Sequence, residues 1–401
     1  LGWTILGLVC LDAVLLLRTP SLTVARRIPG TLPVGVWCEV CLRISSGCAW
    51  PLKLEVFDGI PPALDARGMP GALRLEPGAA ADIPYQVRPK ERGSHRFEAC
   101  HLRLASSLGF WRRNLRRGPD TTVRVFPNFA PVRKYAQFAT SHRLSQFGVH
   151  QKRRRGEGME FHQLREYREG DSLRQIDWKA TARMRRLISR DYQEERDQQI
   201  VFLLDCGRRM RTRDGDLSHF DHTLTAVLLT AYVALREGDA AGLLTFGGAE
   251  RWLPPRKTGA ALDDFLQALY DLQPTTSATD YLAAARDFML RVRKRSLVIL
   301  VTNLRDEEDE TLLRALRLLR TRHLVLLASL RERALEQALE EPVRDFEDAL
   351  LHGAVHDYLD QRGRSFERIH AQGVLSMDVL PDQLSLTLVN RYLALKRGGA
   401  I

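Results

Sequence analysis

The spacing of apolar residues divides the chain into an apolar beginning, a region of short alternating runs and a region of longer patterns. Residues 1–17 are apolar apart from Asp12, and Arg18 ends the run. From about residue 20 to 126, short runs of alternating polar and apolar residues are separated by Pro and Gly turns, a pattern typical of strands. Beyond residue 198, continuous apolar runs alternate with helical patterns. The pattern therefore predicts an α/β plus all-β protein.

Residues 18–126 are predicted to form a small β-sandwich. Several short strands at this spacing are typical of that architecture. The region contains no cluster of His, Cys or carboxylate residues that could support chemistry. The strand-like runs are LTVARRIP, VWCEVCLRIS, LKLEVFDGIP, HRFEACHLRLAS and TTVRVFP.

Residues 198–401 are predicted to form a doubly wound, Rossmann-type parallel sheet. The runs QIVFLLD, AAGLLTFG, SLVILVTNL, HLVLLASL and GVLSMDVL read as strands, with helical patterns between them. Ligands of such sheets bind at the carboxyl ends of the strands, and Asp205 ends the first strand. The phosphate-loop and G-x-G-x-x-G motifs are absent, which argues against nucleotide binding, and no G-x-S-x-G elbow is present.

The apolar beginning, residues 1–17, is predicted to be a transmembrane segment. Its length is the short limit for a span, and Asp12 would cost about 2.5–3.5 kcal/mol near the centre. A signal peptide is disfavoured, because the run lacks a basic leader and a small-residue cleavage site. Arg18, Arg26 and Arg27 follow the run, so the positive-inside rule predicts that the rest of the chain faces the cytoplasm.

Charge is distributed unevenly along the chain. Residues 1–190 carry a net charge of +16 and residues 191–401 carry −5. A basic half favours either nucleic acid or an anionic membrane surface, and the apolar beginning favours the membrane. The six cysteines show no repeated spacing, and the single C-x-x-C at Cys38 and Cys41 lies in a strand-like run, so reduced structural thiols are expected.

Residues 127–197 are predicted to be a connector, and they contain the densest motif, GMEFHQLREYREGDSLRQIDWKATAR at 158–183. A catalytic interpretation would use Glu160, His162, Glu166, Glu169, Asp171 and Asp177 as acids and bases. The motif holds nearly as many cations, so no carboxylate stands out as unpaired. A nucleic-acid interpretation would use residues 152–155 with Arg165, Arg168, Arg183, Arg185, Arg186 and Arg190, but stacking aromatics are few.

The favoured interpretation of this motif is a rigid joint between domains. Asp171 and Ser172 are expected to cap a helix, and Ile176 and Trp178 to supply apolar contacts. Asp177 and Lys179 are expected to form ion pairs with their neighbours. The residues assigned to this joint are Glu160, Phe161, Leu164, Arg165, Tyr167, Gly170, Asp171, Arg174, Asp177, Trp178, Lys179 and Arg183.

Several segments resemble known families. LLDCGRRM, TSATDY and VTNL resemble a von Willebrand factor A (vWA) domain. EFHQLREYREGDSLRQIDWKATAR resembles the signature of bacterial membrane-anchored proteins called the domain of unknown function 58 family. RRIPGTLPVG, ERGSHRFEACHLRLASSLGFWRR, VRVFPNF and GVLSMDVLPDQLSLTLVNRYLALK are similar to the family pattern in the same order, so the resemblance covers nearly the whole chain. The family's N-terminal hairpin of two spans corresponds here to one run, which fits a truncated start.

The vWA resemblance implies a degenerate metal-ion-dependent adhesion site. In an intact site, D-x-S-x-S, a Thr and an Asp coordinate Mg²⁺. This chain has Asp205, Gly207, Arg209, Thr279 and Asn303 at those positions. Two hydroxyls and one carboxylate are missing, whereas Mg²⁺ requires oxygen ligands and anionic charge. No cofactor is therefore expected. Arg209 would either pair with Asp205 in place of the metal or lie exposed on a loop.

The resemblance implies a non-enzymatic scaffold or adaptor in the bacterial inner membrane, with its soluble part facing the cytoplasm. Its partner would be a MoxR-type AAA+ ATPase. The expected contact surface is Asp205, Gly207, Arg208, Arg209, Thr279 and Asn303, extended by Arg211 and Arg213, with the acidic run 306–310 at the same end. The alternatives are a nucleic-acid-binding protein using the basic connector, or a hydrolase using the carboxylates of residues 160–177.

Overall fold

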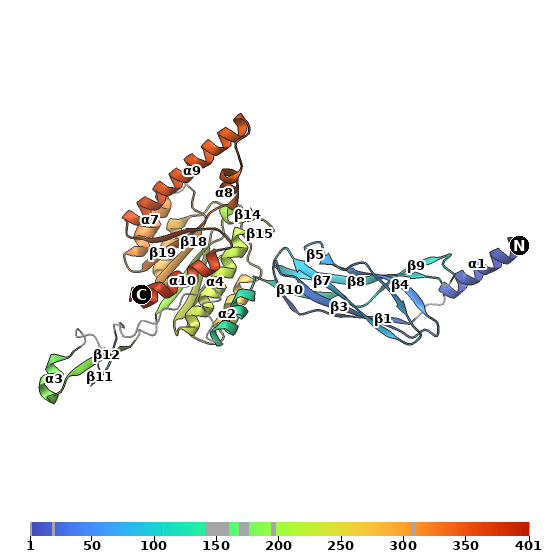
Figure 1. Cartoon of the computed structure of the whole chain (residues 1–401), viewed down its shortest axis with the longest axis horizontal. Coiled ribbons are helices and arrows are strands. Elements are labelled where there is room, and N and C mark those ends of the chain that lie inside the picture. Colours follow the sequence, from blue (N-terminus) through green and yellow to red (C-terminus); the bar gives the residue numbers. More distant parts are fainter. Residues whose placement is uncertain are drawn as a thin grey trace. The chain divides into compact units, whose positions relative to one another are not determined.

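The computed structural model describes residues 2–17, 21–106, 108–140, 160–167, 176–193, 198–305 and 309–400. Within these ranges the protein is a mixed α/β structure with several sheets and ten α-helices (Figure 1). The chain divides into two compact units. The β unit comprises Leu1–Asn128 with Leu269–Asp271, and the α/β unit comprises Phe129–Ala268 with Leu272–Ile401.

Two sheets form most of the β unit. The first has the order β1 (Leu22–Arg27), β3 (Cys38–Ser46), β7 (Ala80–Pro89) and β5 (Leu64–Arg67). The second has the order β2 (Thr31–Pro33), β10 (Thr121–Phe126), β8 (Gly93–Ala105), β4 (Leu52–Gly59) and β6 (Gly71–Leu75), and β9 (Arg112–Arg117) pairs with β8. Burial alternates along β4, so that Leu52, Leu54 and Val56 enter the core while their neighbours face solvent. The strands expected from the alternating runs are present.

The helix α1 (Gly2–Leu17) precedes the first strand. In the part of the chain that the structure describes, no helix has the length and apolar character needed to cross a membrane. Asp12 is buried, and its carboxylate accepts hydrogen bonds from Ser106 Oγ at 2.5 Å and from the Leu108 backbone N–H at 3.1 Å. The indole of Trp111 donates to the carbonyl of Val9 at 3.1 Å. The acidic residue that interrupts the apolar run therefore joins α1 to the β8–β9 turn.

The α/β unit is built on a six-stranded sheet. Its order is β17 (Trp252–Arg256), β16 (Ala240–Phe246), β13 (Gln199–Asp205), β18 (Leu297–Thr302), β19 (Leu324–Leu330) and β20 (Leu375–Val379). All neighbouring strands are parallel except β17, which is an antiparallel edge strand. The second parallel strand lies on one side of β13 and the third on the other, so the strand order reverses at β13. Ligands of open α/β sheets bind at such a switch point, beyond the carboxyl ends of the strands.

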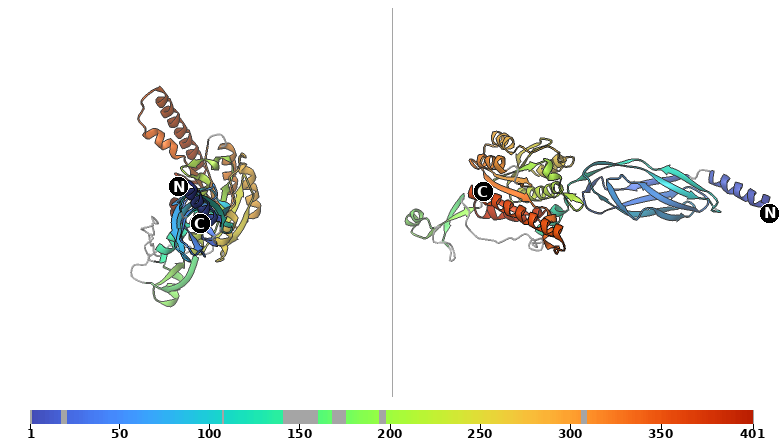
Figure 2. Two further views of the ribbon diagram at one scale, coloured as in Figure 1. Left: turned by 90° about the vertical axis from the view of Figure 1, so that its right-hand side faces the viewer. Right: turned by 90° about the horizontal axis from the view of Figure 1, so that it is seen from above.

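Two pairs of helices lie on opposite sides of this sheet (Figure 2). α4 (His219–Arg236) packs against α10 (Leu384–Arg397), and α6 (Tyr281–Arg291) packs against α7 (Asp309–Arg320). On the α6–α7 side, Val201 and Leu203 of β13 pack in one core cluster with Phe288 and Leu316. α4 begins at a capping box in which Ser218 and Asp221 exchange hydrogen bonds, as expected for a serine before a helical run. The remaining helices of this part are α5 (Ala261–Leu269), α8 (Arg333–Glu340) and α9 (Phe346–Ala371).

The predicted connector contains regular elements. α2 (Ala130–Thr140) contacts α4, where the rings of Tyr135 and Tyr232 meet edge to face with centroids 6.1 Å apart. This part of the connector therefore contributes to the core of the α/β unit. Further along, β11 (Glu160–Glu166) and β12 (Ile188–Gln193) form a separate antiparallel pair, and α3 (Trp178–Met184) lies between them in sequence. We call residues 160–167 and 176–193 the hairpin.

Acid is expected to destabilise the α/β unit partly through His323. This residue precedes β19 and is 3% exposed, and its ring lies edge-on to Phe288 with centroids 5.2 Å apart. Burial and the neighbouring charge of Arg322 lower the pKa of His323 to about 4. The unfolded chain, with a histidine pKa of about 6.5, therefore binds a proton that the folded chain does not, and stability falls as the pH drops from about 6.5 to 4. Urea unfolding across this range measures the slope. His323→Leu is expected to flatten it, and an unchanged slope would remove His323 as its source.

Candidate functional site

Asp205 lies at the carboxyl end of the central strand β13 and is completely buried. Its Oδ1 accepts hydrogen bonds from the Gly207 backbone N–H at 2.8 Å and from Thr279 Oγ1 at 2.9 Å. Its Oδ2 accepts from Thr302 Oγ1 at 2.6 Å, and the Tyr281 hydroxyl lies 2.9 Å from Thr302 Oγ1 and 3.4 Å from Oδ2. Three separate segments thus donate to one carboxylate, as expected for side chains gathered at the carboxyl edge of a parallel sheet.

Burial raises the pKa of Asp205, against the opposing effect of the hydrogen bonds from Thr302, Gly207 and Thr279. Neither alternative for Arg209 holds, because an ion pair with Arg209 is not among the contacts of this carboxylate and the residue is buried. Arg209 is 5% exposed and its guanidinium donates to the carbonyl of Arg305 at 3.3 Å. The physical reason is that hydroxyl and backbone donors already cover both oxygens of Asp205.

The groups around Asp205 are packed so closely that two neighbouring glycines leave little room for a side chain. A Cβ added to Gly207 would lie 2.1 Å from Thr279 Oγ1 and 3.1 Å from Asp205 Oδ1. Gly247, with a φ of +74°, would place a Cβ 3.1 Å from the nitrogen of Gly207. Residue 207 is the position at which the vWA resemblance places a metal-binding serine. In this chain the Thr279 hydroxyl fills the space that such a side chain would need.

Gly207→Ala is expected to lower the free energy of unfolding by about 1–3 kcal/mol, because the new methyl group overlaps Thr279 and the surrounding loops must shift. The matched control is Gly353→Ala in α9, where an added Cβ has nothing within 4 Å. That change is expected to stabilise the protein by about 0.5–1 kcal/mol, because alanine favours a helix over glycine. Chemical denaturation measures both. Equal effects of the two substitutions would contradict the close packing at Gly207.

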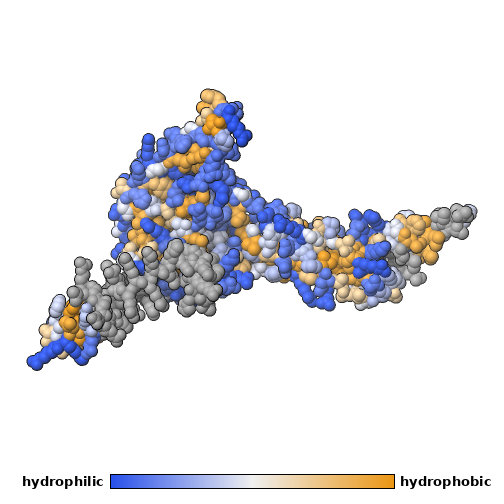
Figure 3. All heavy atoms as spheres, in the orientation of Figure 1, coloured by the Kyte–Doolittle hydropathy of each residue, from blue (hydrophilic) through white to orange (hydrophobic). Residues whose placement is uncertain are grey.

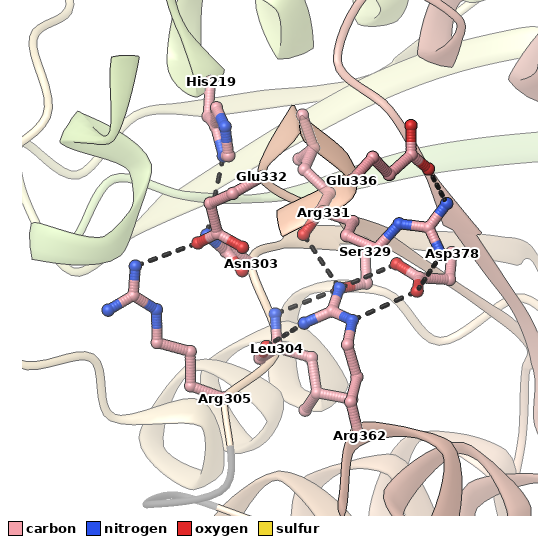
Figure 4. A network of polar contacts seen from close by, with 11 residues as sticks. His219, Asn303, Leu304, Arg305, Ser329, Arg331, Glu332, Glu336, Arg362 and Asp378 are labelled. Atoms are coloured by element: carbon pink, nitrogen blue, oxygen red, sulfur yellow. Dashed lines mark hydrogen bonds and ion pairs between the residues drawn. The ribbon is translucent and has the colours of Figure 1, made fainter. Parts of the chain in front are cut away.

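Asn303, the other expected metal-site position, belongs to a second buried cluster at the same edge (Figure 4). Its side-chain amide donates to Glu332 Oε1 at 2.8 Å and lies 3.5 Å from His219 Nδ1. Arg305 also donates to Glu332 Oε1, at 2.9 Å. Burial opposes ionisation of Glu332, but the hydrogen bonds from Asn303 and Arg305 and the charge of Arg305 hold its pKa below the usual value. Asn303 therefore positions Glu332 and does not contact Asp205.

Sequence reasoning missed Glu332, His219 and Arg362. Glu332 follows the last residue of β19 by two positions, so the strand-end rule that located Asp205 would have found it. Arg362 had no such signal. It comes from α9 and donates to Ser329 Oγ at 2.9 Å, to the carbonyl of Leu330 at 2.8 Å and to the carbonyl of Leu304 (Figure 4). It also holds Asp378 of β20 by two hydrogen bonds of 2.7 and 3.1 Å. This guanidinium thus fastens three strand ends to one helix.

The predicted contact surface is mostly buried. Asp205, Gly207, Arg209, Thr279 and Asn303 lie inside the unit, and Arg208 is the exposed member of that set. The surface here is formed by the 3₁₀ turn η3 (Arg208–Arg211) and the strands β14 (Arg213–Asp214) and β15 (Leu217–Ser218). Arg208, Arg211 and Arg213 are exposed. In the acidic run, residues 306–308 lie outside the described part of the chain, and Glu310 forms an exposed pair with Arg314 at 3.3 Å.

The hairpin differs from the predicted joint at its helix. The N-cap of α3 is Asp177, whose Oδ1 accepts from the Ala180 N–H at 3.0 Å, and the cap predicted at residues 171 and 172 lies outside the described part of the chain. Ile176 is buried as expected, but the Trp178 side chain is 67% exposed, and the contact predicted for it was wrong. Trp178 is the first residue of the short helix α3, and another element would have to pack against that helix to bury it. The apolar pattern alone does not show whether such an element is present.

The remaining motif residues are distributed as follows. In the β11–β12 pairing, Leu164 lies opposite Arg190, and Glu160 lies opposite Gln193 with Phe161 and Arg165 in the same strand. Glu166 pairs with Arg186, and the Tyr167 N–H donates to the Leu187 carbonyl at 2.9 Å. Lys179 and Arg183 are exposed, and neither pairs with a carboxylate in the described ranges, contrary to the expectation for Lys179. Glu169, Gly170, Asp171 and Arg174 lie outside the described residues.

The described residues contain no group of three or more His, Cys, Asp or Glu side chains placed to hold a metal ion. Two of the carboxylates considered for catalysis have structural contacts, since Asp177 caps α3 and Glu166 pairs with Arg186. Cys38 and Cys41 are free thiols. The chemistry that the geometry supports at the sheet edge is hydrogen bonding that holds loops in place.

Residues 163–351 match the model of the family described as "Protein of unknown function DUF58". This part of the chain belongs to the DUF58 family. The resemblance expected from the motif at 158–183 is confirmed for this region. The DUF58 region runs from β11 into α9, and it therefore includes most of the hairpin, Asp205 and the Asn303–Glu332 cluster.

This chain is similar to the "Uncharacterized protein YeaD" of Bacillus subtilis, with 22% identity over 180 residues. The match spans 43% of this chain and 41% of the relative. Among solved structures, a PapD-like domain of human CEP192 has a TM-score of 0.21 at 16% identity, covering 26% of this chain and 84% of that domain. A FixG-related protein from Vibrio parahaemolyticus has a TM-score of 0.19 at 11% identity, covering 26% and 95%. These TM-scores are too low to indicate a shared architecture or function.

Proposed function

We propose that this protein is a membrane-anchored scaffold whose α/β unit is a vWA-like domain that binds a protein partner without a metal ion. The observation that carries the proposal is that groups within the protein already donate hydrogen bonds to both carboxylate oxygens of Asp205. The positions that the vWA resemblance assigns to metal binding, Asp205, Gly207 and Thr279, are brought together, but they contact one another. Hydroxyl and backbone donors take the place that a metal has in an intact site.

Partner recognition then falls to exposed groups around this closed centre. Arg208, Arg211 and Arg213 are exposed on the loop that follows Asp205, in η3 and β14. Guanidinium groups bind carboxylates with defined geometry. An acidic surface on the partner is therefore the expected counterpart, and Asp205 acts by fixing the loop that presents these arginines.

The resemblance to the membrane-anchored family supplies the rest of the proposal. It implies anchoring through residues 1–17, with the remainder in the cytoplasm of a bacterium, and a MoxR-type AAA+ ATPase as the partner. A scaffold requires no catalytic centre and no cofactor. Its requirement is a well-ordered surface, and the buried hydrogen bonds of Asp205 with Thr279 and Thr302 support this requirement by holding together the loops beneath the exposed arginines.

The test is a pull-down of the full chain against a MoxR-type ATPase encoded by the same genome, with and without ATP. Arg208→Glu/Arg211→Glu is expected to abolish binding. Arg293→Glu/Arg295→Glu, which reverses two exposed arginines elsewhere in the unit, is expected to leave it unchanged. Chelator is expected to have no effect. Failure of the unaltered chain to bind in any nucleotide state would remove this partner, and loss of binding in chelator would remove the metal-free site.

A further inference from the structure

Two exposed apolar patches of opposite charge lie in the α/β unit. The first, which we call the basic patch, is on the hairpin. Its apolar members are 67% (Trp178), 52% (Met184) and 46% (Leu187) exposed. Lys179, Arg183 and Arg185 are exposed among them, and none of these three has an ion-pair partner in the described part of the chain. Figure 3 shows apolar surface beside strongly hydrophilic surface at the hairpin, in the lower left of the view.

The second, which we call the acidic patch, lies where α8 leads into α9. Its apolar members are 76% (Phe346), 58% (Leu350), 53% (Leu351) and 51% (Val343) exposed. None of residues 346–354, the first turns of α9, is buried. Glu340, Glu341 and Glu347 are exposed in the same segment, which also contains the exposed Arg344, and these glutamates have no ion-pair partner among the residues that the structure describes. Apolar surface is again visible at this tip in Figure 3.

We propose that the basic patch of one copy of this chain docks on the acidic patch of a second copy. Each patch joins apolar side chains to exposed charges that are mostly of one sign, and the two signs are opposite. Arg344 is the one basic residue in the acidic segment 340–351. Exposed apolar groups rimmed by charge are typical of interaction surfaces, and burying them is favourable by about 25 cal/mol per Å². Complementary charges would set the register of the contact and speed encounter.

A second copy of the chain would be complementary in charge to both patches, whereas a partner of a single charge would be complementary to only one of them. An anionic lipid surface would attract the basic patch, but it would repel Glu340, Glu341 and Glu347. Because each copy carries both halves, the contact is between different surfaces of the two copies. Such a contact either closes into a small ring or continues into a longer assembly. The proposal is independent of the ATPase partner, since it uses neither Arg208 nor Arg211.

The test is sedimentation velocity of the full chain over a range of concentrations, in one buffer with a fixed amount of mild detergent. The first variant, Lys179→Glu/Arg183→Glu/Arg185→Glu, makes both patches acidic. The second, Glu340→Lys/Glu341→Lys/Glu347→Lys, makes both basic. Each variant alone is expected to weaken self-association by at least about 100-fold, because like charges then face each other. All six substituted residues are exposed, so folding is expected to be retained, and circular dichroism checks this.

Mixing the two variants in equal amounts is the decisive arm. The acidic hairpin of the first then meets the basic tip of the second, and association is expected to return to that of the unaltered chain. Arg293→Glu/Arg295→Glu, the matched control, is expected to associate normally. The proposal is overturned if the unaltered chain shows no concentration-dependent association. It is also overturned if the mixture stays as dissociated as the separate variants, or if association is lost only on adding lipid vesicles.

Discussion

Arg362→Ala is expected to lower the free energy of unfolding of the α/β unit by about 3–5 kcal/mol, one of the largest effects of any single substitution in this protein. The side chain of Arg362 is 3% exposed, and Asp378, its partner, is 23% exposed. Removing the guanidinium leaves the carboxylate with only the more distant cation of Arg331, 3.9 Å away. It also removes the guanidinium donors to the carbonyls of Leu304 and Leu330 and one of the two donors to Ser329 Oγ, which keeps the Leu304 N–H, at a site from which water is largely excluded.

Two further variants separate this pair from ordinary loss of a side chain. Arg364→Ala, two residues along α9 and exposed, is expected to change stability by no more than about 0.5 kcal/mol. Arg362→Met/Asp378→Asn removes both charges, and it is expected to recover part of the loss because no carboxylate is left uncompensated. Urea denaturation gives all three values. A loss of stability in Arg362→Ala as small as that in Arg364→Ala would show that the contacts of Arg362 at the strand ends contribute nothing to the stability of the unit.

Arg26→Ala is expected to have a similar effect, about 3–5 kcal/mol, in the β unit. Arg26 of β1 and Asp58 of β4 belong to different sheets, and their side chains are 2% and 0% exposed. The guanidinium donates from Nε to Asp58 Oδ2 at 2.9 Å and from a terminal nitrogen to Oδ1 at 2.5 Å. Tyr85 and Cys100 also donate to Asp58. Burial alone would raise the pKa of Asp58, but these hydrogen bonds and the charge of Arg26 lower it.

The matched control is Arg43→Ala on the neighbouring strand β3. Arg43 pairs with Asp82 at 3.9 Å, but both side chains are about half exposed, so the expected cost is about 0–1 kcal/mol. Cys100 provides a local readout. Burial, with its hydrogen bond to Asp58, raises the pKa of this thiol to about 12, so it is expected to resist thiol reagents until the β unit opens. Equal labelling rates of Cys100 in the two variants would contradict the role given to the buried pair.

Sequence patterns located the regular elements well where one signal dominated. Continuous apolar runs placed β13, β16, β18 and β19, because strands buried on both faces leave no polar positions. Alternation placed β3 and β4. The strands β5, β6, β7 and β9 were not predicted, because their runs are short, or carry Pro84, or are mostly arginine. Their hydrogen-bonded neighbours hold them in strand conformation, and such neighbours are distant in sequence.

The candidate site was only half predictable, for a similar reason. The strand-end rule found Asp205, and the resemblance pointed to Thr279. Neither of them showed which side chains contact each other. Arg209 was considered as a partner of Asp205 because it stands where the vWA resemblance places a metal-binding serine, yet the donors of Asp205 come from residues 207, 279 and 302. The exposure of Trp178 likewise depends on what lies opposite the helix.

The sequence alone determined the strands with the clearest apolar patterns, the position of Asp205 at the end of the central strand, and the match of residues 163–351 to the DUF58 family. Only the tertiary structure decided which charges are buried together. Arg26 with Asp58, and Arg362 with Asp378, are pairs drawn from separate elements. The apolar period of a strand or helix involves residues close together in the sequence, so the sequence shows it directly. The partner of a buried charge depends on how elements pack, because desolvation penalises any charge that packing leaves alone.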